Sequence, residues 1–320
     1  MHHILITQPV PGNLDGMLTK AGFRVTTLHG RGAPTKKRLI AALKSKPFDG
    51  LVTLLTDTVD EEVLDAAPQL RIVSNYAIGF NNIAVDAAKK RGVTVANTPI
   101  SHEYVAEFAL GLIFALALRI PEADRFVRAG RYAGWNPDLM LGTAIGGATL
   151  GLVGTGRIGG SVARRAHALG MKVVYYDPNR NADLERECDA AYYASVKDLA
   201  KVADYVSVHV PLLPQTHHLI NDELLSAMKQ SAFLINTSRG PVVDEKALIT
   251  ALTRGDIAGA ALDVYENEPK IPRALRAMPN VILTPHIGSA REGARREMSE
   301  MTAANLVAYF KGERPKGIIQ

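Results

Sequence analysis

The segment from Ala148 to Leu169 constrains the fold more than any other part of the sequence. A short apolar run, Thr149–Val153, is followed by Gly154-Thr155-Gly156-Arg157-Ile158-Gly159 and then by a helical pattern. Glycines at this spacing, between a strand and a helix, permit a tight turn, allow a pyrophosphate to approach the backbone, and let the helix pack closely on the strand. The pattern predicts the first strand, turn and helix of a dinucleotide-binding unit, with phosphate at the helix N-terminus.

The next predicted strand, Lys172–Tyr176, ends in an acid. Asp177 lies eighteen positions after Gly159. A carboxylate there accepts hydrogen bonds from the adenosine ribose hydroxyls and repels a 2′-phosphate, which favours NAD over NADP. Arg180 lies close enough in the sequence to soften that preference. A glycine-rich turn without a ligand is the alternative, and the flanking strand, helix and acid together disfavour it.

Three residues in the last third of the chain suit the chemistry of a 2-keto acid. Arg239 lies in Asn-Thr-Ser-Arg-Gly, Glu268 precedes Pro269, and His286 follows Pro285. An arginine fork can hold a carboxylate with two parallel hydrogen bonds, and a histidine backed by a carboxylate can transfer one proton near neutral pH. Taken singly, these residues would be read as surface charges and a structural histidine. Their combination with a hydride source makes them catalytic candidates.

Strand and helix patterns alternate along the chain in two stretches. In the first, strands are predicted at 3–7, 23–28, 50–55, 70–75 and 94–97, with helices near 13–20, 36–45, 61–66 and 85–90. In the second, strands are predicted at 149–153, 172–176, 205–208, 232–236, 259–262 and 281–284. Alternation of this kind predicts parallel sheets with right-handed crossovers. We therefore expect an α/β chain with two doubly wound parallel-sheet units.

The boundary between the two units is expected near Thr98-Pro99, where the pattern is interrupted. A long helix from about His102 to Leu118 would cross to the second unit, and a last helix at 290–310 would return to the first. This organisation predicts a substrate-binding (catalytic) domain from residues 1–99 and 288–320 and an NAD-binding domain from residues 100–287. The active site would lie in the cleft between them, because ligands bind at the carboxyl ends of parallel strands.

Five motifs, in order, carry a resemblance to a known family. They are residues 75–83 (Asn-Tyr-Ala-Ile-Gly-Phe-Asn-Asn-Ile), 154–159, 237–240 (Thr-Ser-Arg-Gly), 261–266 (Ala-Leu-Asp-Val-Tyr-Glu) and 284–289 (Thr-Pro-His-Ile-Gly-Ser). Over essentially its whole length the chain resembles the NAD-dependent D-2-hydroxyacid dehydrogenases, most closely the glyoxylate and hydroxypyruvate reductase branch. The resemblance implies two Rossmann-like or flavodoxin-like domains and reduction of a small 2-keto acid by NADH.

The resemblance also implies roles for individual residues. Arg239 would bind the substrate carboxylate, Glu268 would support His286, and His286 would be the general acid or base. Backbone groups of Ala77, Ile78 and Gly79 would line the substrate pocket, and Asp263 would bond the nicotinamide carboxamide. The implied cofactor-binding set is Gly154, Gly156, Arg157, Ile158, Gly159, Asp177, Pro211, Thr216, Thr237, Ser238, Arg239, Asp263, His286 and Gly288.

Several positions narrow the expected substrate. Glu268 stands where formate-oxidising relatives carry a different residue, and Ile78 stands where phosphite-oxidising relatives place a lysine. Trp135, before Asn136-Pro137, resembles a segment that the neighbouring subunit contributes to the pocket in the glyoxylate reductase branch. The alternative is a core tryptophan in a connecting loop. Bulk at Tyr76, Ile78 and Trp135 predicts glyoxylate and hydroxypyruvate as substrates, with pyruvate as a further candidate.

The bulk properties exclude several other classes. A 320-residue chain with 47% hydrophobic residues can bury a core of two domains. No apolar run reaches about eighteen residues, so no membrane span is expected. The N-terminus lacks a secretory signal, and the single cysteine, Cys188, reads as a bystander thiol in a reducing compartment. We therefore expect a cytoplasmic protein, and we expect no metal site.

The charge of the chain concerns its partners. The net charge is +5 and the pI is about 9.2. Basic residues are interspersed with acids on apparent helix faces, so a solvated surface is favoured over nucleic-acid binding. The helix around 108–118 is apolar nearly all round, and the family resemblance places it at a two-fold contact, which implies a homodimer built on the NAD-binding domain. An NAD-sensing regulatory scaffold of the same fold remains the alternative function from another class, and oxidation of another small anion such as phosphite remains an alternative reaction.

Overall fold

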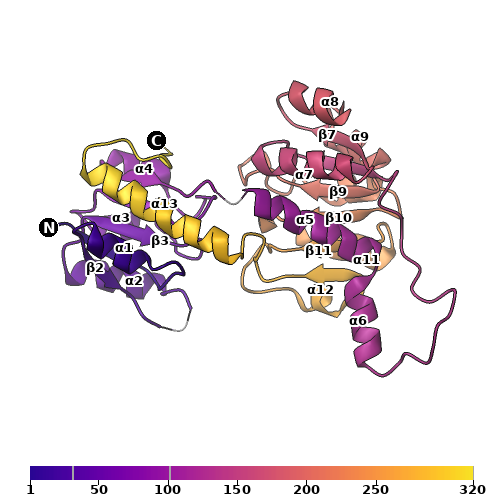
Figure 1. The fold of residues 1–320 in the computed structure, drawn as a ribbon, viewed down its shortest axis with the longest axis horizontal. Helices are drawn as coiled ribbons and strands as arrows, with labels where there is room; N and C mark the ends of the chain where they lie inside the picture. The colour runs from indigo at the N-terminus through magenta and orange to yellow at the C-terminus, as the bar shows by residue number, and fades with distance from the viewer. Residues whose placement is uncertain (31, 101, 320) are drawn as a thin grey trace. The chain divides into compact units, whose positions relative to one another are not determined.

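The computed structural model describes residues 1–30, 32–100 and 102–319, and the chain divides into two compact units. Unit 1 comprises Met1–Ser101 and Ser289–Gln320, and unit 2 comprises His102–Gly288. Each unit has one sheet with helices on both faces (Figure 1). Every strand pair is parallel. The predicted α/β class with two parallel sheets is confirmed.

The sheet of unit 1 has five strands in the order β2-β1-β3-β4-β5. The strands are β1 (His3–Ile6), β2 (Arg24–Thr27), β3 (Gly50–Thr53), β4 (Ile72–Asn75) and β5 (Thr94–Ala96). This is the strand order of flavodoxin-like sheets. Successive side chains of a strand point to opposite faces, so Leu5 and Ile4 belong to different cores.

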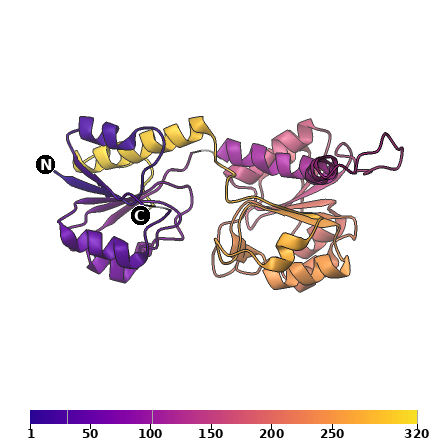
Figure 2. The same ribbon diagram turned by 90° about the horizontal axis from the view of Figure 1, so that it is seen from below.

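Helices cover both faces of this sheet (Figure 2). One layer contains α1 (Leu14–Lys20) and α13 (Glu292–Phe310), which pack on each other. The other layer contains α2 (Lys36–Ser45), α3 (Glu61–Asp65) and α4 (Val85–Lys90). Thr35 and Asp60 cap the N-termini of α2 and α3 by accepting a backbone N–H bond. The C-terminal segment thus completes the core of the unit that the N-terminal segment begins.

The sheet of unit 2 has seven strands in the order β12-β11-β10-β9-β6-β7-β8. They are β6 (Thr149–Val153), β7 (Lys172–Tyr176), β8 (Ala191–Tyr192), β9 (Tyr205–Val208), β10 (Phe233–Asn236), β11 (Gly259–Leu262) and β12 (Val281–Leu283). The chain starts in the middle at β6, adds strands on one side, and returns to the other side at β9. Dinucleotides bind at such a reversal of strand order.

Two helix layers also cover this sheet (Figure 2). One layer holds α5 (His102–Ala117), α7 (Arg157–Ala168) and α8 (Ala182–Cys188). The other holds α9 (Val196–Val202), α10 (Asp222–Ala227), α11 (Glu245–Arg254) and α12 (Arg273–Ala277). A single 3-10 turn, η1 (Gly240–Val242), follows β10. Cys188 is buried in the α5/α7 core, as expected for a bystander thiol.

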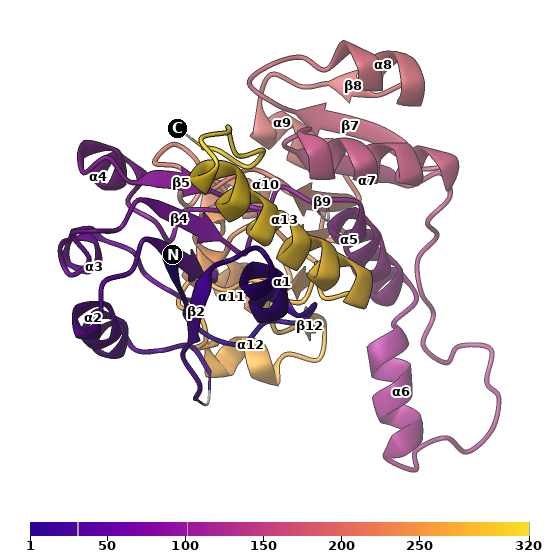
Figure 3. The ribbon, with the colours of Figure 1, turned by 60° about the vertical axis from the view of Figure 1, so that its left-hand side comes forward.

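Helix α6 (Ile120–Arg128) projects past the edge of the sheet, and the first part of the loop after it stands away from the rest of unit 2 (Figure 3). The end of that loop returns to the unit, where Ile145 packs against the core. No residue of α6 is buried. Among the described residues no single helix is long and apolar enough to cross a membrane, although α5 and α6 together, bent by 59°, pass on length and composition.

Candidate active site

Arg239, Glu268 and His286 follow three neighbouring strands of unit 2. Arg239 comes after β10, Glu268 lies in the loop after β11, and His286 comes after β12. Parallel strands place their carboxyl ends at one edge of the sheet, which brings residues 29 and 18 positions apart in sequence to one place. His286 Nδ1 lies 3.0 Å from Glu268 Oε2. The predicted acid-supported histidine is therefore formed in the structure.

The carboxylate of Glu268 is held in its ionised form. Burial raises the pKa of Glu268, but the hydrogen bond to His286, the charge of His286, the N–H of Tyr265 and the charge of Arg239 lower it, and the net pKa lies below its usual value. Tyr265 N donates to Glu268 Oε1 at 3.0 Å. One oxygen is thus fixed by the backbone while the other faces the imidazole.

The backbone of His286 has an unusual conformation that is fixed by its neighbours. Its φ is 56°, in the left-handed region. A non-glycine residue is held there only when its surroundings enforce it, and such strain concentrates at functional sites. The N–H of His286 donates to Asp263 O at 2.9 Å, and Asp263, which is 1% exposed, accepts bonds from Ile287 N and Gly288 N. Asp263 therefore anchors the turn that aims the imidazole.

Arg239 is held by a turn that Asn236 organises. Asn236 Oδ1 accepts bonds from Ser238 N and Ser238 Oγ, and its amide donates to Arg239 O at 2.9 Å. Burial lowers the pKa of Arg239, and the charge of Glu268 partly offsets this. The guanidinium remains charged, because the ordinary pKa of arginine lies far above neutral pH. A side chain of this kind gives a half-buried, permanent cation beside the Glu268–His286 pair.

The glycine-rich loop has the three properties expected of a dinucleotide site. Gly154 has a φ of 95°, and a Cβ on Gly159 would overlap Gly154 O. These glycines are required by the turn and by the close packing of α7 on β6. A Cβ on Gly156, the N-cap of α7, would meet no atom within 4 Å. The space beside Gly156 is thus open to a bound phosphate at the N-terminus of α7, whose first residues are Arg157 and Ile158, so the residues present fit a dinucleotide.

Asp177 is linked directly to this loop. Its Oδ2 accepts bonds from Thr155 N at 2.8 Å and Thr155 Oγ1 at 3.2 Å. Asn181, which the sequence patterns did not single out, donates to Thr155 O at 3.2 Å and caps α8. Arg180 makes two bonds to Glu185, at 3.0 and 2.8 Å, and lies over the Tyr192 ring. The carboxylate of Asp177 therefore faces the loop, and Arg180 is engaged with an acid.

The remaining predicted cofactor residues follow the strands β9 and β10. Thr216 Oγ1 donates to Pro211 O at 2.6 Å and accepts from Leu213 N, which fixes that loop. Thr237 is buried, and its hydroxyl has no hydrogen-bond partner among the described residues. His209 packs behind the glycine-rich loop, and burial lowers its pKa to about 4, so it is neutral. The sequence patterns had not singled out His209.

The predicted substrate loop lies in unit 1, directly after β4. All three of its carbonyl groups are occupied: Ala77 O accepts from Thr98 N, Ile78 O from the Asn97 amide at 2.6 Å, and Gly79 O from the Asn75 amide at 2.8 Å. Within the described part of the chain, the N–H groups of Ile78 and Gly79 make no hydrogen bond. The carbonyl groups of the loop are therefore fixed by hydrogen bonds, and the N–H groups of Ile78 and Gly79 remain as donors of the kind that bind carboxylates.

Trp135 lies in the loop at 129–148 and is 83% exposed. The alternative reading as a core tryptophan is therefore wrong. A side chain this large and apolar is rarely left so open on a monomer surface. Its contribution to a substrate pocket stays a prediction.

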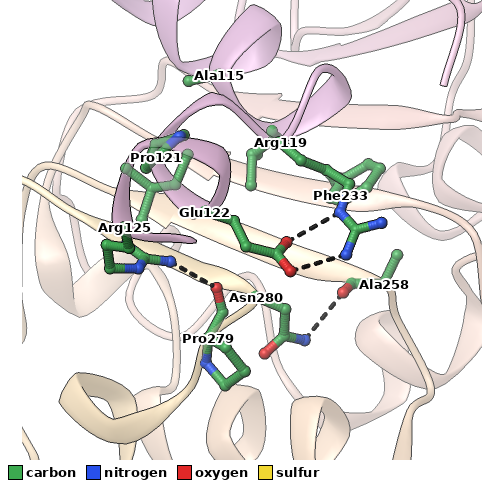
Figure 4. Close-up of a pocket in the computed structure, with 11 residues that line it drawn as sticks. Ala115, Arg119, Pro121, Glu122, Arg125, Phe233, Ala258, Pro279 and Asn280 are labelled. Carbon is green, nitrogen blue, oxygen red and sulfur yellow. Dashed lines mark hydrogen bonds and ion pairs between the residues drawn. The ribbon is translucent and has the colours of Figure 1, made fainter. Parts of the chain in front are cut away.

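A surface pocket of about 260 Å³ lies at the other edge of the unit 2 sheet, where β10, β11 and β12 begin (Figure 4). Arg119 and Glu122 pair through two bonds at its wall, and Arg125 donates to Pro279 O. None of the predicted site residues lines it. Within the described residues there is also no group of three His, Cys, Asp or Glu side chains placed to hold a metal ion.

Comparisons with known proteins agree with this geometry. Residues 110–288 match the family described as D-isomer specific 2-hydroxyacid dehydrogenase, NAD binding domain. The chain is 49% identical over 300 residues to a glyoxylate reductase of Korarchaeum cryptofilum, covering 93% of this chain and 90% of that protein.

Two solved structures cover nearly the whole chain. A protein from Thermus thermophilus is 39% identical, with a TM-score of 0.92, over 99% of this chain and all of that one. An NADPH-dependent glyoxylate/hydroxypyruvate reductase from Sinorhizobium meliloti is 32% identical, with a TM-score of 0.86, over all of this chain and 97% of that one. The resemblance that the five motifs indicated is confirmed, and the chain belongs to the D-isomer specific 2-hydroxyacid dehydrogenases, a family of oxidoreductases that use a nicotinamide dinucleotide.

Proposed function

We propose that this chain is a reductase of small 2-keto acids, taking glyoxylate, hydroxypyruvate and pyruvate to the corresponding 2-hydroxy acids. The observation that carries the proposal is the pairing of His286 with Glu268 at 3.0 Å, beside the half-buried Arg239. The relative from Korarchaeum cryptofilum is a glyoxylate reductase, which supports a small substrate. Unit 2 would be the nucleotide-binding domain, and unit 1 would contribute the substrate loop.

Each residue of the site would have a separate task in the reaction. The guanidinium of Arg239 would hold the substrate carboxylate and orient the keto group. The N–H groups of Ile78 and Gly79, which make no hydrogen bond among the described residues, are donors suited to the same kind of anion. His286, protonated and supported by Glu268, would donate its proton to the carbonyl oxygen. A bound NADH supplies the hydride that the carbonyl carbon receives.

We propose NADH rather than NADPH as the preferred reductant. Asp177 supports this, because its carboxylate would stand against a 2′-phosphate and would accept bonds from a free ribose 2′-hydroxyl. The pairing of Arg180 with Glu185 supports it further, since that cation is already neutralised. The structural relative from Sinorhizobium meliloti is NADPH-dependent, so both cofactors occur among proteins of this fold.

We also propose a cytoplasmic homodimer. Seven large apolar side chains within residues 118–141 are substantially exposed: Leu118, Ile120, Val127, Tyr132, Trp135, Leu139 and Leu141. They lie on α6 and on the segments that flank it, and we infer that this exposed apolar surface is a protein interface. The predicted dimer contact through α5 must be extended to α6 and its flanking segments, because eight residues of α5 are already buried within their own unit.

A panel of keto acids tested with both cofactors, followed at the nicotinamide absorbance, examines the proposal. Glyoxylate and hydroxypyruvate should have a higher kcat/KM than phenylpyruvate or 2-ketoisocaproate, because the side chains that line a small pocket leave no room for the larger acids and overpacking costs about 1–3 kcal/mol. No turnover of any keto acid would instead favour a regulatory NAD-binding protein.

Three substitutions test the site itself. His286→Gln should lower kcat by about a hundredfold or more, the usual scale for a lost general acid. Arg239→Lys should mainly raise KM, because lysine cannot make the bidentate contact. Glu268→Gln should move the decline of reduction with rising pH to lower pH, since the protonated imidazole loses its counter-charge. An unchanged pH profile in Glu268→Gln would contradict the supporting role.

A further inference from the structure

The position of the Glu268 carboxylate depends on a short turn. Glu268 Oε1 accepts the N–H of Tyr265 at 3.0 Å, and Oε2 lies 3.0 Å from His286 Nδ1. The chain between Tyr265 and Glu268 therefore folds back, so that the backbone N–H of Tyr265 at the start of the turn bonds the side chain of Glu268 at its end. Any shift of this turn would move the carboxylate away from the imidazole.

A buried acid from another helix supports the middle of this turn. Glu245, the first residue of α11, is 5% exposed, and its Oε1 accepts the N–H of Glu266 at 2.8 Å. Its helix does not need it as a cap, because Asp244 already accepts the N–H groups of Lys246 and Ala247. A buried carboxylate is costly unless it is hydrogen-bonded, so the contact with Glu266 accounts for its presence.

The other contacts of the turn fix its ends and its outer side. A Cβ on Gly240, the residue after Arg239, would overlap the backbone of Tyr265. The Tyr265–Glu268 turn therefore packs directly against the segment that carries Arg239. Tyr265 Oη donates to Thr284 O at 2.8 Å. The side chain of Glu266 lies 2.8 Å from His218 Nε2. The bond that Glu245 accepts from Glu266 N ties the backbone between Tyr265 and Glu268 to a side chain of another element.

Several charged side chains lie around the Tyr265–Glu268 turn. Burial raises the pKa of Glu245, the N–H of Glu266 lowers it, and the charges of Glu266 and Glu268 raise it further, so the net pKa is above its usual value. His218 faces Glu266 and Asp244, and Arg239 faces Glu268. Because Gln offers the same acceptor oxygen without charge, the hydrogen bond and the charge of Glu245 can be separated by substitution.

We propose that Glu245 is a positioning residue: its hydrogen bond to the N–H of Glu266 holds the Tyr265–Glu268 turn so that the carboxylate of Glu268 stays against His286. This inference rests on the proposed function, in which Glu268 supports the proton donor. Glu245 does not touch the substrate or the imidazole and acts only through the turn. A purely structural role would instead affect the stability of unit 2 without affecting proton transfer.

The test compares three substitutions at Glu245 in the full-length enzyme. Glu245→Gln keeps the acceptor oxygen, and Glu245→Met removes it in a side chain of similar length. Glu245→Asp keeps the charge but shortens the side chain by one methylene group, which moves the acceptor away from Glu266 N. Leu248→Ala, at a fully buried position of the same helix, is the matched control for lost stability. For each variant, the thermal midpoint and the pH dependence of kcat/KM for glyoxylate reduction are measured.

Glu245→Met should move the decline of activity with rising pH down by about half a unit to one unit, a part of the shift expected for a fully lost carboxylate neighbour. Glu245→Asp should move this decline in the same direction, and Glu245→Gln should keep the pH profile of the wild type. Leu248→Ala should lower the thermal midpoint and leave the profile unchanged. If Glu245→Met does not fold, the Asp and Gln variants make the same comparison.

A double substitution separates this inference from the proposed function. In a Glu268→Gln background, Glu245→Met should cause no further shift, because the carboxylate that it positions is already gone. An additive shift, an unchanged profile in both Glu245→Met and Glu245→Asp, or a Glu245→Gln profile like that of Glu245→Met would overturn the positioning role. If Glu268→Gln itself leaves the profile unchanged, the proposed role of Glu268 fails first.

Discussion

Asp177 contacts the glycine-rich loop before any cofactor is bound, since Thr155 donates two hydrogen bonds to it. A carboxylate fixed in this way cannot turn aside easily to accommodate a 2′-phosphate. We therefore predict that Asp177→Ser narrows the preference for NADH over NADPH by about tenfold or more, which corresponds to about 1.4 kcal/mol. The measurement is kcat/KM for glyoxylate with each cofactor. A wild-type enzyme that uses NADPH as well as NADH would contradict the assignment.

Arg180 provides a second residue-scale prediction. The sequence places it where it could attract a 2′-phosphate, but the structure pairs it with Glu185 and stacks it over Tyr192. Arg180→Ala should therefore change kcat/KM with NADPH by less than about threefold. A large fall in NADPH use would show that the guanidinium leaves Glu185 to bind the phosphate. Arg186→Ala is a suitable control, because Arg186 pairs with an acid on the same helix.

Residues differ in how far the sequence alone reveals them. His286 and Glu268 could be predicted because their motifs are specific, and the structure places them in contact. Asn181 and Glu245 could not, because their roles arise from contacts with residues that are distant in the sequence. Glu245, for example, bonds a backbone N–H 21 positions away. No local pattern carries that information, since a Glu in the first turn of a helix is ordinarily explained by the helix dipole.

At the scale of elements, most predicted strands and helices match the structure within one or two residues. Buried parallel strands are short apolar runs, and helices α2 and α3 begin after a side chain that caps them. Helix α6 was not among the predicted elements, although proline is well tolerated in the first turn of a helix and Pro121 lies there. Strand β8 was not predicted either, since two residues at a sheet edge leave no periodic pattern.

The substrate loop after β4 gives an element-scale prediction. Asn97, which follows β5, holds Ile78 O at 2.6 Å. Asn97→Ala should free this carbonyl and let the loop move, raising KM for glyoxylate by up to about tenfold, the worth of one hydrogen bond of about 0.5–1.5 kcal/mol, while kcat changes less. Asn280→Ala removes a comparable amide bond, to Ala258 O in unit 2, and should leave KM unchanged. Equal effects of the two substitutions would refute the specific role of the loop.

At the scale of the whole molecule, the two sheets differ in what they supply. The sheet of unit 2 carries the glycine-rich loop, Arg239, Glu268 and His286 at the ends of its strands, and the sheet of unit 1 carries a loop whose free donors suit an anion. The exposed apolar surface of α6 and its loop belongs to neither set. We predict that it forms a homodimer, with a mass in light scattering of twice 34.5 kDa at micromolar concentration. Val127→Asp, on the exposed face of α6, should weaken the dimer because it places a charge in an apolar contact. A monomer with full activity would contradict the prediction.

Trp135 gives the last prediction, which joins this surface to the reaction. A tryptophan that is 83% exposed on one chain gains most by burial against another, and the resemblance to the glyoxylate reductase branch suggests that it covers the partner's substrate pocket. If so, Trp135→Ala should raise kcat/KM for phenylpyruvate relative to glyoxylate, because space opens for a larger side chain. Tyr132→Ala, on the same loop and also exposed, is the matched control and should leave that ratio unchanged. If Trp135→Ala weakens the dimer without changing the ratio, Trp135 contributes to assembly alone. The limit on substrate size must then come from Ile78 and its neighbours, because Tyr76, which the sequence placed in the pocket, is 4% exposed and packs in the core of unit 1.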